Sequence, residues 1–429
     1  MQKKLLILTT ATIAVFSINL PKAAAQLGIG TATPAPSAML DISSTNKGVL
    51  LPTMTAANRA GISAPATGLL VFQTDGIPGF YYYNGSNWVA VGTNGAVANN
   101  SGYLVGTVTT LAGSGFGGST DATGTAASFN NPYSVAVDAS GNVYVADAQN
   151  NKIRKVTSAG VVTTFAGSGS AGSTDATGTA ASFNFPTGVA VDAGGNVYVA
   201  DASSHKIRKI TSAGAVTTIA GSGSIGSTDA TGTAASFNYP YGVAVDAAGN
   251  VYVADNSNHK IRKVTAAGVV TTLAGSGSIG STDATGTAAS FNYPTSVAVD
   301  AGGNVYCADN NNHKIRKVTS VGVVTTLAGS GNSGSIDATG TAASFNYPFG
   351  VAVDASGNVY VGDQNNQKIR MVTSLGVVTT LAGSGSQGSI NATGTAASFY
   401  LPSGLAVDAS GYIYVGDRGN NKIRKIVGP

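Results

Sequence analysis

Residues 240–277 read PYGVAVDAAGNVYVADNSNHKIRKVTAAGVVTTLAGSG, and this stretch decides the fold. Small and β-branched residues alternate within Val-Ala-Val and Val-Tyr-Val-Ala, which is typical of short strands in sheets that are covered on both faces. Between these two runs Asp246 stands first and Gly249 fourth, as a type I turn prefers. We therefore predict four short antiparallel strands here, followed by a long loop over residues 278–293.

The stretch recurs along the chain with a fixed period. Each copy begins with a proline, and successive prolines are 54 residues apart: Pro132, Pro186, Pro240, Pro294, Pro348 and Pro402. A strand-rich unit repeated at this period indicates a β-propeller with one blade per unit. The 58 glycines and a charged fraction of only 10% also favour strands and tight turns over helices.

The sixth unit stops at residues 425–429, one strand short of a full blade. Residues 106–113, GTVTTLAG, match the fourth strand of the other units and precede the first complete unit, so they can pair with the last blade. Such closure removes exposed sheet edges, which promote aggregation. We predict an all-β protein in which residues 103–429 form a six-bladed β-propeller of four-stranded antiparallel blades, closed by this N-terminal strand.

The repeated motifs resemble a known family. GNVYVAD at residues 249–255 and NHKIRKV at residues 258–264 resemble NHL repeats, and residues 226–246 are similar to the long-loop bacterial version of that repeat. The resemblance covers about three quarters of the chain and implies an NHL propeller. Propellers include enzymes, sensors and adhesins, so the fold alone does not supply the function.

Residues 1–25 have the pattern of a signal peptide. Lys3 and Lys4 precede the apolar run of residues 5–16, and the three alanines at residues 23–25 provide a cleavage site. No later stretch is long and apolar enough to cross a bilayer. We therefore expect an exported protein without a transmembrane segment, located outside the cell, on the cell surface or in the periplasm.

Residues 26–92 differ in character from the repeats. Residues 69–72 and 81–83 are predicted to be strands, with Trp88 on a third, which makes a small β-rich module. The motifs GIGTATP and YYNGSNW resemble N-terminal modules of exported and cell-surface proteins of the Bacteroidetes. Residues 93–102, with Asn, Gly and Ser and few large apolar residues, are the predicted linker to the propeller.

Charge and cysteine content narrow the classes of partner and chemistry. The net charge is +4, and each repeat combines basic residues with acidic ones, so no nucleic-acid partner is expected. The single cysteine, Cys307, stands where the other five repeats have Val, which excludes a disulfide within the chain. We interpret it as a small buried hydrophobic residue rather than a nucleophile.

Three histidines, His205, His259 and His313, occupy one equivalent position in units 2 to 4, and a set of three raises a metal hypothesis. Equivalent atoms on different blades are separated because each lies at a distance from the ring axis, whereas zinc ligands lie about 2 Å from the metal. We therefore predict no metal and no cofactor, with a site on these three histidines as the alternative.

Every unit also has an aspartate at the end of its second strand and an arginine in its third. The pairs are Asp147–Arg154, Asp201–Arg208, Asp255–Arg262, Asp309–Arg316, Asp363–Arg370 and Asp417–Arg424. Sixfold repetition argues against acid–base catalysis, which needs unlike groups in unlike environments. We predict ion pairs or turn hydrogen bonds within the blades, and no catalytic residues.

The residues beside the prolines vary between otherwise near-identical units. Those that are aromatic in units 2 to 5 are Phe185, Tyr239, Tyr241, Tyr293, Tyr347 and Phe349. Aromatic faces stack on sugars or anchor peptides, so these six are the candidate ligand-binding residues. The alternative is that they only wedge between blades.

Together these features predict a non-enzymatic binding scaffold, secreted or on the cell surface, whose partner is an extracellular protein, peptide or glycan. The alternative is an enzyme, a lyase or hydrolase with its site in the central channel. The amidating lyases, which resemble this family, bind metal near the axis through histidines, but this chain has no histidine outside the repeated position. An enzyme should also break the repeat with unmatched polar residues on the axis, and we expect none. The sequence does not predict the oligomeric state.

Overall fold

The structure is a computed structural model, and it describes residues 27–29, 40–42, 49–75, 79–83, 85–86, 88–90 and 106–427. The predicted signal peptide, residues 1–25, and the predicted linker, residues 93–102, lie outside the described residues. None of the helices in the described part of the chain is long and apolar enough to span a bilayer.

Residues 107–427 form six four-stranded antiparallel sheets, here called blades 1 to 6 in the order of their prolines. In blade 3 the strands follow one another in chain order: β16 (Pro240–Val245), β17 (Val251–Asp255), β18 (Lys260–Val264) and β19 (Val270–Ala274). The all-β class and the repeated four-stranded antiparallel sheets are therefore as predicted.

The other blades have the same organisation. Their first strands are β8 (Pro132–Val137), β12 (Pro186–Val191), β20 (Pro294–Val299), β24 (Pro348–Val353) and β28 (Pro402–Val407). Their second strands are β9 (Val143–Asp147), β13 (Val197–Asp201), β21 (Val305–Asp309), β25 (Val359–Asp363) and β29 (Ile413–Asp417). Their third strands are β10 (Lys152–Val156), β14 (Lys206–Ile210), β22 (Lys314–Val318), β26 (Lys368–Val372) and β30 (Lys422–Val427). Their fourth strands are β11 (Val162–Ala166), β15 (Val216–Ala220), β23 (Val324–Ala328), β27 (Val378–Ala382) and β7 (Thr107–Ala112).

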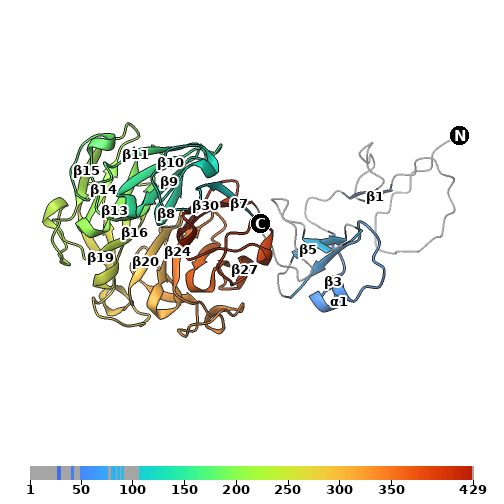
Figure 1. Cartoon of the computed structure of the whole chain (residues 1–429). Helices are drawn as coiled ribbons and strands as arrows, with labels where there is room; N and C mark the ends of the chain where they lie inside the picture. Colours follow the sequence, from blue (N-terminus) through green and yellow to red (C-terminus); the bar gives the residue numbers. More distant parts are fainter. Residues whose placement is uncertain are drawn as a thin grey trace, which may run out of the picture.

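The first strands lie around the centre of the propeller. Each contacts the first strand of the next blade, and β28 of blade 6 contacts β8 of blade 1. In Figure 1, β8, β16, β20 and β24 lie in the middle of the propeller, whereas β15, β19 and β27 lie toward its rim. This arrangement brings the residues beside the six prolines close to the axis.

The strand missing from the sixth repeat comes from the N-terminal side of the propeller. In blade 6, β7 pairs antiparallel with β30, and the register places Val108 opposite Ile426 and Thr110 opposite Arg424. The predicted pairing between these two segments is therefore confirmed. Val108 has an exposed fraction of only 1%, so the strand also contributes to the core.

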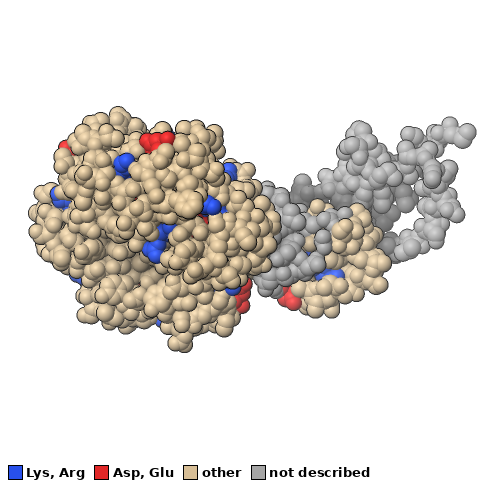
Figure 2. All heavy atoms as spheres, in the orientation of Figure 1, with Lys and Arg blue, Asp and Glu red and all other residues tan. Residues whose placement is uncertain are grey.

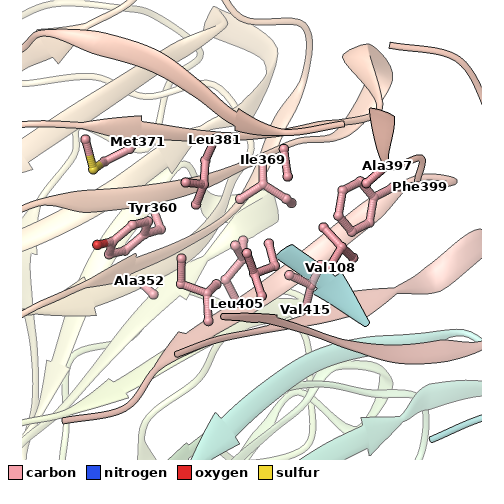
Figure 3. Close-up of a cluster of buried hydrophobic side chains, with 13 residues drawn as sticks. Val108, Ala352, Tyr360, Ile369, Met371, Leu381, Ala397, Phe399, Leu405 and Val415 are labelled. Atoms are coloured by element: carbon pink, nitrogen blue, oxygen red, sulfur yellow. The ribbon is translucent and has the colours of Figure 1, made fainter. Parts of the chain in front are cut away.

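The hydrophobic core is divided among the seams between neighbouring blades. The cluster in Figure 3 combines Tyr360 and Ile369 of blade 5 with Leu405 and Val415 of blade 6, and Val108 of β7 packs beside them. Successive side chains of a strand point to opposite faces of the sheet. Each blade therefore packs one set of side chains into the seam on one side and the other set into the seam on the other side. Each blade is therefore stabilised from both sides.

Cys307 lies in one of these seams. It has no exposed surface and packs within the cluster that joins blades 3 and 4. Burial raises the pKa of its thiol well above the ordinary value. Its position agrees with the prediction of a small buried hydrophobic residue.

In each repeat a short 3-10 turn follows the second strand. These turns are Ala148–Asn150, Ala202–Ser204, Asn256–Asn258, Asn310–Asn312, Gln364–Asn366 and Arg418–Asn420. The long loop before each first strand contains a second set: Gly124–Ala126, Gly178–Ala180, Gly232–Ala234, Gly286–Ala288, Gly340–Ala342 and Gly394–Ala396. Within blade 3, the N–H of Ser257 donates to the carbonyl oxygen of Asn238. The end of the long loop and the turn after the second strand therefore lie on the same face of the propeller, as predicted.

The N-terminal region is described in part. Its strands are β1 (Leu27–Ile29), β2 (Leu40–Ile42), β3 (Thr53–Met54), β4 (Leu70–Gln73), β5 (Gly79–Tyr83) and β6 (Trp88–Ala90), and α1 spans Ala56–Ala60. β1 and β2 pair in parallel, and the other four form one sheet in the order β3-β4-β5-β6. The three predicted strands are present as β4, β5 and β6. The guanidinium of Arg59 lies 4.0 Å from the ring centroid of Tyr81 and is buried in this small module.

Candidate ligand-binding site

The six repeated arginines lie inside the blades. Each has no exposed surface, and its Nη1 donates to the aspartate at the end of the second strand at 2.6 to 2.8 Å: Arg154, Arg208, Arg262, Arg316, Arg370 and Arg424. In blade 3 the same Asp255 also accepts the N–H of Asn238. The predicted ion pairs within the blades are confirmed.

Each buried arginine also donates to a second side-chain acceptor. In blade 3, Nη2 of Arg262 donates to Asp229 of the long loop at 2.5 Å, and four other blades have the same contact. In blade 6, Asn391 replaces this aspartate and accepts from Arg424 at 2.7 Å. Because carboxylate and guanidinium hold each other in every blade, these groups are part of the scaffold.

The three histidines join neighbouring blades. Nδ1 of His205, His259 and His313 accepts the backbone N–H of the tyrosine that precedes the next proline, at 3.1 Å in all three cases. The two rings also meet edge to face, with centroids 4.6 to 4.8 Å apart. Burial lowers the pKa of all three imidazoles.

The other blades make the same link with an amide. Oδ1 of Asn151, Oε1 of Gln367 and Oδ1 of Asn421 accept the equivalent backbone N–H at 2.7 to 2.9 Å. Each histidine therefore lies on a different seam with its Nδ1 occupied. Within the described residues, no group of three or more His, Cys, Asp or Glu side chains is placed to hold a metal ion.

The aromatic residues after the prolines meet at the axis. Tyr133, Tyr241 and Phe349 come from blades 1, 3 and 5, and their ring centroids are 5.7 to 6.3 Å apart. Three rings from alternate blades can approach so closely only near the centre of the ring of blades. The ring of Phe185, from blade 2, contacts the ring of Tyr133 edge to face, with the centroids 5.2 Å apart.

Arg418 joins these rings from blade 6. Its guanidinium lies 4.7 Å from the centroid of Tyr133 and 5.7 Å from that of Phe349. We call the set of Tyr133, Phe185, Tyr241, Phe349 and Arg418 the axial cluster. Arg418 is an unmatched polar residue near the axis, so the expectation that none would be found there is wrong. The signal was present in the sequence, because the five equivalent residues are Ala148, Ala202, Asn256, Asn310 and Gln364.

The structure divides the six predicted ligand-binding residues into two groups. Phe185, Tyr241 and Phe349 belong to the axial cluster, which Tyr133 and Arg418 complete. The other three, here called the seam tyrosines, pack against the histidines of the preceding blades and still expose 38 to 40% of their surface: Tyr239, Tyr293 and Tyr347. Their backbone has φ of +48° to +52°, which places each tyrosine at a turn into the first strand.

Two cavities lie along the axis. One of about 10 Å³, lined by Thr187, Ser296 and the three rings of Tyr133, Tyr241 and Phe349, has room for a single water molecule. The other, of about 170 Å³, is lined only by Val, Ala and Leu from the six first strands, for example residues 243–245. The described lining of this larger cavity contains no titratable side chain.

Comparison with protein families agrees with this architecture. Residues 183–210, 237–264, 291–318, 345–370 and 399–426 match the NHL repeat family, and they fall on blades 2 to 6. Five of the six blades therefore contain a segment that matches the NHL repeat. Residues 28–110 match a family described as a phage tail like trimerisation region.

Part of this chain is also similar in sequence to curated proteins. Protein SUPPRESSOR OF QUENCHING 1, chloroplastic, of Arabidopsis thaliana is 31% identical over 268 residues, which is 57% of this chain and 25% of that protein. The chain therefore spans about a quarter of the length of this curated relative.

Two solved structures from Bacteroides thetaiotaomicron are also similar. A structural genomics protein of unknown function has a TM-score of 0.59 at 22% identity, covering 83% of each chain. An auxiliary nutrient binding protein has a TM-score of 0.57 at 16% identity, covering 78% of this chain and 82% of the other. At these identities the likeness shows the β-propeller fold alone.

Proposed function

We propose that this chain is an exported, non-enzymatic binding protein, a closed six-bladed NHL propeller that binds a glycan on its axial cluster. The observation that carries the proposal is the gathering of Tyr133, Tyr241 and Phe349 at the axis. The blades are otherwise near-identical, so selectivity must come from positions at which they differ. Aromatic rings supply large contact areas with sugars and are enriched where binding energy is concentrated.

Export and surface location rest on the sequence pattern of residues 1–25. A lysine pair, an apolar run and a small-residue cleavage site form a signal peptide. An auxiliary nutrient binding protein shares the propeller fold, so this fold can serve as a binding scaffold. Figure 2 shows charged groups scattered over the visible face among uncharged residues, which supports a ligand other than nucleic acid.

We also propose that the N-terminal region joins three copies of the chain. Residues 28–110 match a trimerisation region, and they include the four-stranded sheet with its buried Arg59. Three propellers on one stem would present three axial clusters, and linked sites bind a multivalent ligand far more tightly than single ones. Light scattering of the exported chain tests this directly: the mass should be three times that of one chain, and a monomer would contradict it.

The enzyme alternative places a lyase or hydrolase site in the central channel. Such reactions need a general acid or base within hydrogen-bond reach of the substrate. The larger cavity, about 170 Å³, is lined by Val, Ala and Leu, and the repeated Asp–Arg pairs are engaged with each other inside the blades. Arg418 breaks the repeat at the axis, as an enzyme would require, but an arginine stays protonated in proteins and supplies no general acid or base. The described residues therefore favour binding over catalysis.

Screening the exported chain against a glycan array tests the proposed function. A double variant, Tyr133→Ala with Tyr241→Ala, should lose binding, by roughly 1 to 3 kcal/mol for each ring. Phe116→Ala is the matched control, because Phe116 is 80% exposed and lies outside the axial cluster. Binding that survives the double variant would contradict the proposal, as would a loss of binding fully explained by a lower melting temperature.

A further inference from the structure

We propose that the axial cluster recognises a carboxylate on the sugar ring of its ligand, and that Arg418 pairs with this carboxylate. The inference rests on the proposed function and adds the chemical class of the ligand, an acidic glycan built of uronic acids. Three properties of Arg418 support this inference: it departs from the repeat, it has no carboxylate partner among the described residues, and it lies against aromatic rings.

Arg418 departs from what its equivalents do. Nδ2 of Asn256 and of Asn310 donates at 3.0 Å to the carbonyl oxygen of the proline that begins the next blade. These amides are buried and complete the seam between two blades. Arg418 instead lies against the rings of Tyr133 and Phe349 at the axis. Blade 6 therefore has a cation near the axis where blades 3 and 4 have a seam hydrogen bond.

Arg418 also has no partner for its charge. Each of the six arginines inside the blades has a carboxylate within ion-pair distance, whereas no carboxylate in the described part of the chain lies that close to Arg418. Its Nε is buried without a hydrogen-bond partner among the described residues, as are those of Arg262 and Arg424, so the missing carboxylate is what distinguishes Arg418. A guanidinium offers a planar fork of donors that matches a carboxylate, and partial removal of water strengthens such a pair.

The surroundings of Arg418 suit a sugar ring. The guanidinium lies over the ring of Tyr133, and the hydroxyl of Tyr241, whose pKa is raised by burial, interacts electrostatically with Arg418. The cavity beneath the rings measures only about 10 Å³. A peptide side chain would find no pocket there, whereas a pyranose chair that rests its C–H face on the aromatic surface needs none.

Calorimetric titration of the exported chain with trigalacturonate and with its methyl ester tests the inference without any variant. Both probes have the same rings, and only the acid carries charge. We expect the acid to bind at least tenfold more tightly than the ester, with an affinity that falls as salt is added. Equal binding of acid and ester, or no binding of trigalacturonate, would overturn the inference.

Variants of Arg418 locate the effect. Arg418→Asn installs the residue of blades 3 and 4, so the melting temperature should stay unchanged while trigalacturonate binding falls at least tenfold and ester binding does not. Arg418→Lys keeps the charge but not the planar fork and should retain part of the affinity. Lys155→Ala removes one positive charge from the third strand of blade 1 and is the matched control.

The outcomes separate this inference from the proposed function. Binding of neutral glycans that depends on Tyr133 and Tyr241 but not on Arg418 would leave the glycan function standing and overturn the carboxylate inference. Absence of binding to every glycan would overturn both. Tighter, Arg418-dependent binding of a short peptide with a free C-terminal carboxylate than of its amide, exceeding that of trigalacturonate, would replace the sugar with a peptide and overturn the inference.

Discussion

The arginines inside the blades and Arg418 at the axis place the same guanidinium group in opposite settings. Arg262 has no exposed surface and donates to Asp255 at 2.7 Å and to Asp229 at 2.5 Å. Arg418 lies against Tyr133 and Phe349, without a carboxylate partner among the described residues. The group that occurs six times stabilises the blades, and the group that occurs once is the one that we propose pairs with a ligand.

The aromatic residues show the same contrast. The seam tyrosines repeat in three successive blades, and each is tied to a histidine of the preceding blade through a backbone hydrogen bond of 3.1 Å. The rings of Tyr133, Tyr241 and Phe349 come from alternate blades and contact one another. In a repeat protein, interactions that recur between neighbours stabilise the array, so features that break the repeat are the better guide to function.

Removal of the closing strand should have the largest effect. Deletion of residues 106–113 takes β7 from blade 6 and leaves β30 with an unpaired edge. It also removes Val108, which is 1% exposed, from the core of the last seam. We expect an aggregation-prone chain, because exposed edges pair with other chains. Size-exclusion chromatography checks this, and a monodisperse, fully folded deletion variant would show that the pairing is dispensable.

A break in one buried ion pair should have the next largest effect. Asp255→Ala leaves Arg262 charged and buried, which costs about 3 to 5 kcal/mol of the free energy of unfolding. Asp229→Asn is the control, because Asn391 occupies this place in blade 6 and accepts from Arg424 at 2.7 Å. Since the Asp229 side chain is 44% exposed, we expect a loss under about 1 kcal/mol. Urea denaturation of both variants measures the difference, and equal losses would contradict the distinction.

The link between blades should have an intermediate effect. His259→Ala leaves the backbone N–H of Tyr293 without its acceptor and removes a ring contact with a centroid separation of 4.6 Å. We expect a loss of about 1 to 3 kcal/mol in the free energy of unfolding. His259→Asn should restore most of it, because Asn151 and Asn421 make the same link in blades 1 and 6. Thermal denaturation of the two variants tests the link, and equal stability of Ala and Asn would refute it.

The smallest effect concerns pH. Burial lowers the pKa of His205, His259 and His313 in the folded chain, so the unfolded chain takes up protons first as the pH falls below about 6.5. The contribution of the histidines to stability should therefore be constant at higher pH and decline as the pH falls through this value toward the lower folded pKa, whereas Asp201, whose pKa burial raises to about 6, contributes with the opposite sign. The urea midpoint at pH 8 and at pH 5.5 measures the decline. Replacement of all three histidines by Asn should reduce this decline in the urea midpoint. A decline of unchanged size would mean that other groups cause it.

Much of the scaffold followed from the sequence. The 54-residue period, the strand pattern and the match of residues 106–113 to a fourth strand predicted the four-stranded blades and the pairing of β7 with β30. Every unit has an aspartate and an arginine at the positions equivalent to Asp255 and Arg262, and this recurrence predicted the ion pairs. These features depend on contacts within one repeat or between neighbouring strands, so a single repeat already contains the information for them.

The site depended on the tertiary structure. Tyr133 and Tyr241 are two repeats apart, and only the curvature of the ring brings them to one point on the axis. The histidines and the seam tyrosines likewise became partners because one blade packs against the next. Arg418 was visible in the sequence as a departure from Ala, Asn and Gln, but nothing local showed that its side chain would turn toward the axis instead of into the seam. The repeat determines its own blade, whereas packing of all the blades determines which unmatched side chains meet.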